Sequence, residues 1–435
     1  MRTPHTPLNR PRAFLLALGL VGAAGAVAAA DPPLHQVSAE TCKGCHQEIY
    51  RQWQDSMHAK STALADPIHG AFYREEVGDP KAEGQVHKKM KTFPVCLSCH
   101  APNAARDKTT KLDAKPAYSE GVNCVACHTL KSYKGIKGQD GKLRLGLAAY
   151  ETAETLQGPA GFPRGLDQLA AAGDLFGGAV GSAAEDQKPN PHLGEPVQFR
   201  GQPVPALALE ANPVQLRTSD ACLGCHDQRN NPQGVPLCQT GNEYAAGDTK
   251  VACQSCHMAV SGGLSDHSMS GGHSEAMLKR SVVFELHTQP AGDKLKTRVR
   301  LQNLQPHSMP TGAPFRNLHL KLVAYNGAGE AVWENTKSHP AKDDPQGYFT
   351  YTMVDDQGQP AMPPVATKAG ADSRLKPYET RELVYEIPAA GVALVRAELY
   401  YSLLWPALAE KLDTVPAKER APVLIAVSER AVAAR

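Results

Sequence analysis

The chain has 435 residues, a length that allows two or three domains, and its 46 Lys and Arg residues nearly balance 44 Asp and Glu residues. This balance argues against nucleic acid as a partner, because nucleic-acid-binding domains carry a clear excess of basic residues. Aromatic residues make up only 6% of the chain, so the amino acids alone supply little bulky material for a large core.

The first 30 residues have the pattern of a secretory signal peptide. Three Arg residues precede an apolar run over residues 13–27, and Ala28-Ala29-Ala30 forms a small-residue exit. An uncleaved membrane anchor is the alternative, but the run is short and rich in Ala and Gly. We therefore expect cleavage of residues 1–30 and export to the periplasm, or further to the cell surface. No later stretch is apolar and long enough to span a bilayer, so we expect no integral membrane segment after cleavage.

The most specific pattern in the chain is Cys-x-x-Cys-His, which occurs five times, at residues 42–46, 96–100, 124–128, 222–226 and 253–257. This spacing is the attachment signature of c-type haem. Two thiols three residues apart can add to the two vinyl groups of one porphyrin, and the next residue, His, then binds the iron. Zinc is the competing interpretation, but a zinc site needs ligand pairs that collect into fours, whereas each pair here has its own adjoining His.

The sequence thus predicts five covalently bound haem c groups. The expected attachment thiols are Cys42, Cys45, Cys96, Cys99, Cys124, Cys127, Cys222, Cys225, Cys253 and Cys256. The expected iron ligands on the motif side are His46, His100, His128, His226 and His257. Cys238 stands outside the motifs, and either an intermolecular disulfide or a buried, inert thiol would account for it.

We expect residues 31–275 to form the pentahaem cytochrome domain, mainly helical or irregular with sparse secondary structure. Strong periodicity is confined to short helical stretches such as residues 47–59. Residues 129–221 are rich in Gly, Ala and Pro, and we interpret them as an irregular insertion with one helix near residues 165–172. Porphyrins would replace aromatic side chains as packing material, and five of them in so short a domain must lie close together.

Beyond this region the pattern changes and predicts an all-β C-terminal domain over residues 276–435. Six segments alternate in polarity or run in β-branched and aromatic residues, at 281–286, 294–301, 318–325, 381–387, 392–401 and 423–427. Short strands at this spacing favour a β-sandwich-like fold. The domain has no Cys, so it carries no covalent haem.

Each haem iron has a second axial position, and the ligand there decides between an electron carrier and a catalyst. Eleven His remain after the five motif His and His5 of the signal peptide, so two-His ligation of every haem is possible. The candidates are His58, His192, His267, His273 and His307, which have Gly, Pro or Ser close by, with His69 and His87 in reserve. Met309 or Met258 is the alternative and would raise the reduction potential.

Four stretches of the chain resemble the multihaem cytochromes of the cytochrome c-554 type. They are the first motif through Tyr50 and Trp53 to His58, the Gly-Val-Asn before Cys124, residues 222–258, and residues 303–316 with their Pro-Thr-Gly. The resemblance implies haem pairs stacked in parallel or at right angles, mostly with two His ligands, that pass electrons. The family's longer members have a Gly before the His of the last stretch, where this chain has Pro306.

The leading hypothesis is a periplasmic or cell-surface pentahaem cytochrome that relays electrons between two redox protein partners, a donor and an acceptor. One alternative is a multihaem oxidoreductase that acts on a small nitrogen or sulfur compound at one five-coordinate haem. Another is a subunit of an extracellular cytochrome filament, and an oligomer is compatible with the sequence. Because no Cys-x-x-Cys-Lys motif occurs, we favour the carrier over the enzyme and assign no catalytic residue.

Overall fold

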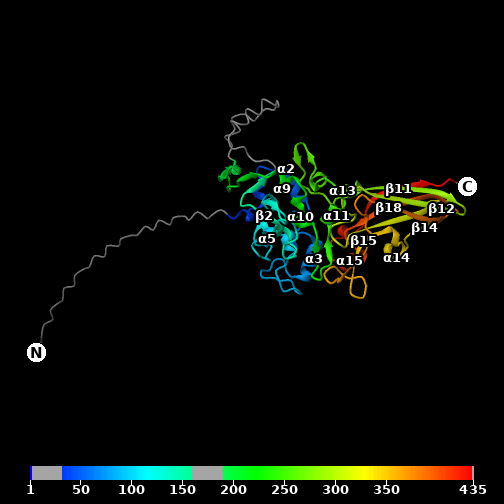
Figure 1. Cartoon of the computed structure of the whole chain (residues 1–435), viewed down its shortest axis with the longest axis horizontal. Coiled ribbons are helices and arrows are strands. Elements are labelled where there is room, and N and C mark those ends of the chain that lie inside the picture. The colour runs from blue at the N-terminus through cyan, green and yellow to red at the C-terminus, as the bar shows by residue number, and fades with distance from the viewer. Residues whose placement is uncertain (2–31, 159–189, 434–435) are drawn as a thin grey trace, which may run out of the picture. The chain divides into compact units, whose positions relative to one another are not determined.

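The computed structural model describes residue 1, residues 32–158 and residues 190–433. The predicted signal peptide, apart from Met1, and the helix predicted near residues 165–172 lie outside these residues. The described residues from Pro33 onward form one compact unit (Figure 1). We call residues 32–280 the haem region and residues 281–433 the β region.

The haem region consists of short helices joined by irregular segments. Its α-helices are α1 (Ala39–Lys43), α2 (Gln47–Asp55), α3 (Pro67–Glu76), α4 (Leu97–His100), α5 (Pro102–Arg106), α6 (Pro116–Ser119), α7 (Cys124–His128), α9 (Pro213–Arg217), α10 (Asp220–His226), α11 (Thr240–Ala246), α12 (Cys253–His257) and α13 (Glu275–Lys279). Its 3-10 helices are η1 (Leu34–Gln36), η2 (Gly146–Ala149) and η3 (Pro191–Leu193). The stretch predicted at residues 47–59 is helical over α2, so that part of the prediction is confirmed.

Short strand pairs complete the haem region. They are β1 (Leu130–Tyr133) with β2 (Tyr150–Thr152), β3 (Leu156–Gly158) with β6 (Leu209–Ala211), β4 (Val197–Phe199) with β5 (Gln202–Val204), β7 (Arg229–Asn230) with β8 (Pro236–Cys238), and β9 (Val260–Ser261) with β10 (Leu264–Ser265). Each strand has at most four residues, so these pairs brace loops and do not build a sheet core.

The β region holds longer antiparallel strands in two sheets. One sheet has the order β11 (Val282–Ala291), β12 (Lys294–Asn303), β17 (Thr380–Pro388). The other has the order β16 (Lys368–Asp372), β15 (Tyr348–Val354), β13 (Asn317–Asn326), β18 (Val392–Ser402), β19 (Val423–Ala431), with β14 (Ala331–Glu334) paired to β13. The connections contain α14 (Pro340–Asp343), η4 (Pro345–Gly347), α15 (Pro406–Lys411) and α16 (Ala417–Arg420).

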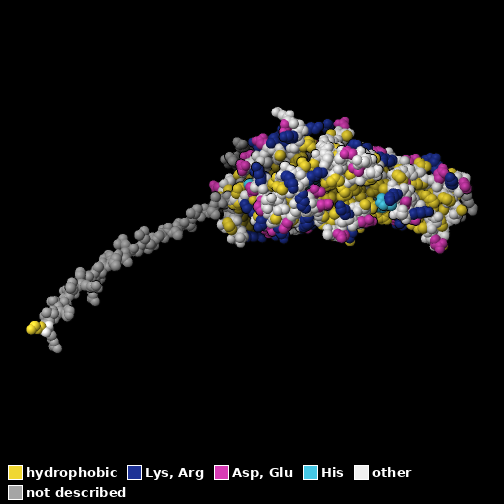
Figure 2. Space-filling view, turned by 90° about the horizontal axis from the view of Figure 1, so that it is seen from below, with side chains coloured by type: hydrophobic (Ala, Val, Ile, Leu, Met, Phe, Trp, Pro, Cys, Tyr) yellow, Lys and Arg dark blue, Asp and Glu magenta, His cyan; other side chains and the backbone are white. Residues whose placement is uncertain are grey.

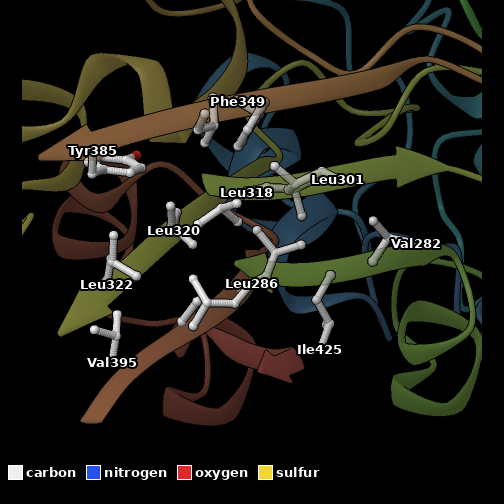
Figure 3. Packing of buried hydrophobic residues seen from close by; sticks show 14 of the residues in the cluster. Val282, Leu286, Leu301, Leu318, Leu320, Leu322, Phe349, Tyr385, Val395 and Ile425 are labelled. Carbon is white, nitrogen blue, oxygen red and sulfur yellow. The ribbon is translucent and has the colours of Figure 1, made fainter. Parts of the chain in front are cut away.

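All six predicted strands are present, which confirms a C-terminal region rich in antiparallel strands. Side chains along β12 and β17 alternate between buried and more exposed positions, as expected for strands with one face on a core. Leu286 and Leu301 of the smaller sheet share a single core with Leu318 and Leu320 of the larger one (Figure 3). The finer prediction of a β-sandwich, and the boundary between residues 275 and 276, stay predictions.

Apolar side chains join the two regions. Ile68 of α3 packs in one buried cluster with Leu404, which precedes α15, and with Leu408 of α15. The rings of Phe72 and Phe315 stack at 5.4 Å. This contact fixes the β region against the haem region along α3 (Figure 1). Lys and Arg are interspersed with Asp and Glu over the visible face of the molecule, in keeping with the balanced composition (Figure 2). Within residues 32–158 and 190–433, every helix is too short or too polar to cross a bilayer.

Candidate haem-binding sites

Each of the five motifs adopts a helical turn, which gathers its thiols and its His. His100, His128, His226 and His257 end the helices α4, α7, α10 and α12, and His46 caps the start of α2. Residues three and four positions apart lie on the same face of a helix, so Cys, Cys and His of one motif face the same space. The third motif is held by Asn123, whose side chain accepts a hydrogen bond from the backbone N–H of Ala126 at 3.2 Å.

Three motif histidines have a second histidine at the distance that a shared iron requires. Ring centroids are 5.9 Å apart for His46 and His192, 5.9 Å for His58 and His226, and 6.4 Å for His257 and His307. Two imidazoles bound to opposite sides of one iron, with Fe–N bonds of about 2 Å, hold their centroids about 6 Å apart. These three pairs therefore fit the axial positions of the first, fourth and fifth haems.

His267 is the candidate partner of His128. Its charge lowers the pKa of His128, after the larger effect of burial, and it acts on His46 in the same direction. Since His46 already faces His192, His267 is left for the third motif.

The second motif differs from the others. The rings of His100 and His69 are 3.9 Å apart at 66°, too close for an iron between them. Both Nδ1 atoms contact the carbonyl oxygen of Ser61, at 3.0 and 2.9 Å, which keeps them less than about 6 Å apart. Two imidazoles on opposite sides of one iron would hold these atoms about 8 Å apart. His69 also has a buried Nε2 without a hydrogen-bond partner. As it stands, the pair fits an iron only after one ring moves.

The second ring nitrogen of the candidate ligands supports iron binding through Nε2. Nδ1 donates to a backbone carbonyl in His128 (Gln157, 2.8 Å), His192 (Leu207, 2.9 Å), His257 (Ser270, 2.6 Å), His267 (Ser265, 2.8 Å) and His307 (Ser308, 3.0 Å). A carbonyl can only accept, so the proton lies on Nδ1 and Nε2 is left with its lone pair. Metal-bound His residues are held in this way. The donor set thus fits haem iron.

Burial keeps the imidazoles of His226 and His58 neutral, as an iron ligand must be. Burial, and then the charge of His58, lowers the pKa of His226 to about 3. Burial, and then the charge of His257, lowers the pKa of His58 to about 4. At neutral pH both rings are therefore free of a second proton and able to bind a metal.

Two of the predicted candidates make other contacts. His273 places Nδ1 3.3 Å from the carboxylate of Glu419. In His87, Nδ1 accepts from the backbone N–H groups of Lys89 and Met90, both at 3.2 Å, and Nε2 lies 3.6 Å from Glu76. The proton of neutral His87 is thus on Nε2, the reverse of the ligand arrangement. In the described part of the chain, no ring contact links either residue to a motif histidine.

The thiols place the motifs next to one another in an order that differs from the sequence. Side-chain contacts join Cys42 to Cys124, Cys99 to Cys225, and Cys222 to Cys253. These free thiols stand in for the thioether sulfurs of the haem-bound protein. The first motif thus adjoins the third, and the fourth adjoins both the second and the fifth.

Several neighbours of the motifs have no recognisable pattern in the sequence. Arg229 donates through Nη2 to Cys99 Sγ at 2.7 Å and through Nε to the carbonyl of Cys225 at 3.3 Å, between the second and fourth motifs. The role of the Ser61 carbonyl as partner of His69 and His100 could not be predicted from the sequence, because every residue has a backbone carbonyl. Cys238 is a free thiol with Sγ 3.8 Å from the carbonyl oxygen of His226.

Comparisons with known proteins agree with this arrangement. The family described as cytochrome c554 and c-prime matches residues 41–129. A penta-heme cytochrome c552 from Thermochromatium tepidum, known from its crystal structure, is 64% identical and covers 92% of this chain and 100% of its own, with a TM-score of 0.86. A DUF1425 family member from Shewanella sp. pv-4 is 16% identical, covers 28% of this chain and 73% of its own, and has a TM-score of 0.14. No curated protein matches the chain.

Fold and motifs together define a multihaem c-type cytochrome, a class that transfers electrons. Within that class, the chain belongs to the penta-haem cytochromes and carries five covalently bound haem c groups.

Proposed function

We propose that the chain is an exported electron relay, in the periplasm or at the cell surface, which passes electrons between a donor and an acceptor protein through five closely spaced haems. Each iron would be held between two His, which leaves no position for a substrate. The pairs would be His46 with His192, His226 with His58, His257 with His307, and His128 with His267. His100 would pair with His69 after one of the two rings moves.

The observation that carries this proposal is the set of three histidine pairs at 5.9, 5.9 and 6.4 Å. Two strong axial ligands keep haem iron low-spin in both oxidation states, so little rearrangement accompanies electron transfer. The thiol contacts between neighbouring motifs support the relay, because adjoining attachment points bring porphyrin edges close together. In such a protein the polypeptide sets the spacing and the reduction potentials.

A second candidate function is supported by the second motif. Because His69 does not stand across an iron position from His100, the haem there is the one best suited to an open site. An open haem would allow the chain to oxidise or reduce a small nitrogen or sulfur compound.

The ferric absorption spectrum, recorded with and without nitrite, hydroxylamine and sulfite, distinguishes the two functions. The relay predicts an entirely low-spin protein that none of the three compounds alters. A high-spin component of about one fifth of the haem that shifts with these compounds would contradict it and support catalysis at the second motif.

A further inference from the structure

One buried carboxylate of the haem region holds the loop that carries His307. Glu243 lies on α11, between the fourth and fifth motifs, and is only 8% exposed. Its Oε1 accepts from Arg374 Nη1 at 2.6 Å. Its Oε2 accepts from the backbone N–H of Ser308 at 3.2 Å and from Thr311 Oγ1 at 2.5 Å. Both oxygens therefore bind the β region, one of them directly beside His307.

Residues of the β region also form hydrogen bonds with this loop, residues 304–312. Asn303 Nδ2 donates to the carbonyl of His307 at 2.8 Å. Met309 and Leu375 exchange backbone hydrogen bonds at 2.8 and 3.0 Å. These contacts hold the loop against the β region but do not determine its position relative to the fifth motif.

Contacts between α11 and the loop fix the position of the loop relative to the fifth motif. Besides Glu243, Thr240 Oγ1 lies 2.9 Å from Thr311 Oγ1. Gly247, directly after α11, lets the carbonyl oxygen of Pro306 approach so closely that a Cβ there would lie only 2.6 Å from it. The residue before His307 therefore packs against the helix that leads into the fifth motif.

The ion pair is better suited to positioning than to stabilising the fold. Arg374 is 9% exposed and also binds Asp372, through Nε at 2.9 Å and Nη2 at 3.0 Å. A buried ion pair gives little net stability, because the loss of hydration offsets the attraction, but removing one partner is costly. Its contribution is therefore a fixed geometry, here between α11 and the His307 loop.

We propose that Glu243 is a positioning residue for the fifth haem: it holds the 304–312 loop so that His307 reaches the iron opposite His257. The inference rests on the proposed two-histidine ligation of that haem. Without the carboxylate, Ser308 and Thr311 lose their acceptor, and the imidazole is released from its place.

The test uses the haem-loaded full chain carrying Glu243→Gln. This variant keeps the size of the side chain but replaces one acceptor oxygen with an NH2 group, so that Arg374 and the loop can no longer both be bound. We measure the ferric spin state and the affinity for cyanide, a strong ligand that binds an iron only when a position opens. The expected result is a high-spin fraction of up to one fifth of the haem and cyanide binding about tenfold tighter at that haem, from the loss of buried hydrogen bonds. Thr311→Val, which removes one hydrogen bond, should shift both in the same direction by less.

Asp344→Asn is the matched control. Asp344 is also a buried carboxylate, and it accepts from Tyr385 Oη at 2.7 Å and Asn335 Nδ2 at 2.5 Å, within the β region and away from the loop. The Asp344→Asn protein should be less stable than the unaltered protein, but its haem spin state should not change. If Glu243→Gln leaves the spin state and the cyanide affinity unchanged while His307→Ala changes both, the positioning role of Glu243 is wrong but the ligation by His307 stands. An unchanged His307→Ala would instead overturn the ligation itself.

Discussion

At the residue scale, the direction of one hydrogen bond distinguishes His87 from candidate ligands such as His192 and His267. Where Nδ1 donates to a carbonyl, as in His192 and His267, Nε2 is free for iron. Where Nδ1 accepts from a backbone N–H, as in His87, Nε2 carries the proton. Local sequence cannot reveal this difference, because the carbonyl comes from a residue far along the chain or from the fold of a loop.

The sequence identified the motif thiols and a surplus of histidines but not their pairing. His69 was a reserve candidate, yet it touches His100, whereas His273, a first choice, faces Glu419. Both have a Gly close by in the sequence, so this criterion could not distinguish them. Which iron a histidine reaches depends on tertiary contacts that no short window of sequence contains.

His58→Ala is expected to open the sixth position of the fourth haem. His58 lies 5.9 Å from His226, ring to ring, so its loss should convert about one fifth of the ferric haem to the high-spin form. Electron paramagnetic resonance of the oxidised protein measures this fraction. His87→Ala is the control and should leave the signal unaltered, and equal high-spin signals in both variants would contradict the assignment.

At the element scale, strands were easier to predict than the short helices that hold the haems. Segments such as β12 alternate because one face meets the core. Strand β15 was missed because Tyr348, Phe349, Thr350 and Tyr351 are all buried, which removes the alternation. In the haem region, helices of four to ten residues are too short for a periodic pattern, and the motif itself is the local signal.

Asn123→Ala is expected to weaken the helix of the third motif. The Asn123 side chain caps α7 and also donates to the carbonyl of Val37 at 3.2 Å. Loss of such a cap costs roughly 1–2 kcal/mol. Chemical denaturation of the haem-loaded protein measures the change. Asn242→Ala, at an exposed position of α11, should have a much smaller effect, and equal losses would contradict the capping role.

At the scale of the whole molecule, the β region packs against the haem region and carries His307, the proposed ligand of the fifth haem. Apolar packing of α3 on α15 and the Glu243–Arg374 pair join the two. His307 of the β region was one of the ligand candidates in the sequence, and its ring lies 6.4 Å from that of His257. The joint itself was not predictable, because its partners lie more than 100 residues apart.

The Asp372–Arg374 ion pair, which adjoins this joint, should make stability depend on pH in acid. Burial would raise the pKa of Asp372, but hydrogen bonds from Arg374 and Lys376 outweigh it and lower the pKa to about 2. In the unfolded chain the pKa is about 3.9, so the stabilisation is complete above that pH and is lost as the pH falls towards 2. The melting temperature of Asp372→Asn should therefore lie below that of the unaltered protein at pH 6, and the gap should close between about pH 4 and pH 2. A gap that is constant across this range would contradict the ion pair.

The central claim is that histidine pairs hold the haems of an electron relay. Near-infrared magnetic circular dichroism of the ferric protein tests it most directly, because the energy of the charge-transfer band identifies both axial ligands. With the haem content measured on the same sample, the account predicts five haems per chain and bands of two-histidine ligation for all of them. A methionine–histidine band, or a high-spin signal from one or more of the five haems, would contradict it.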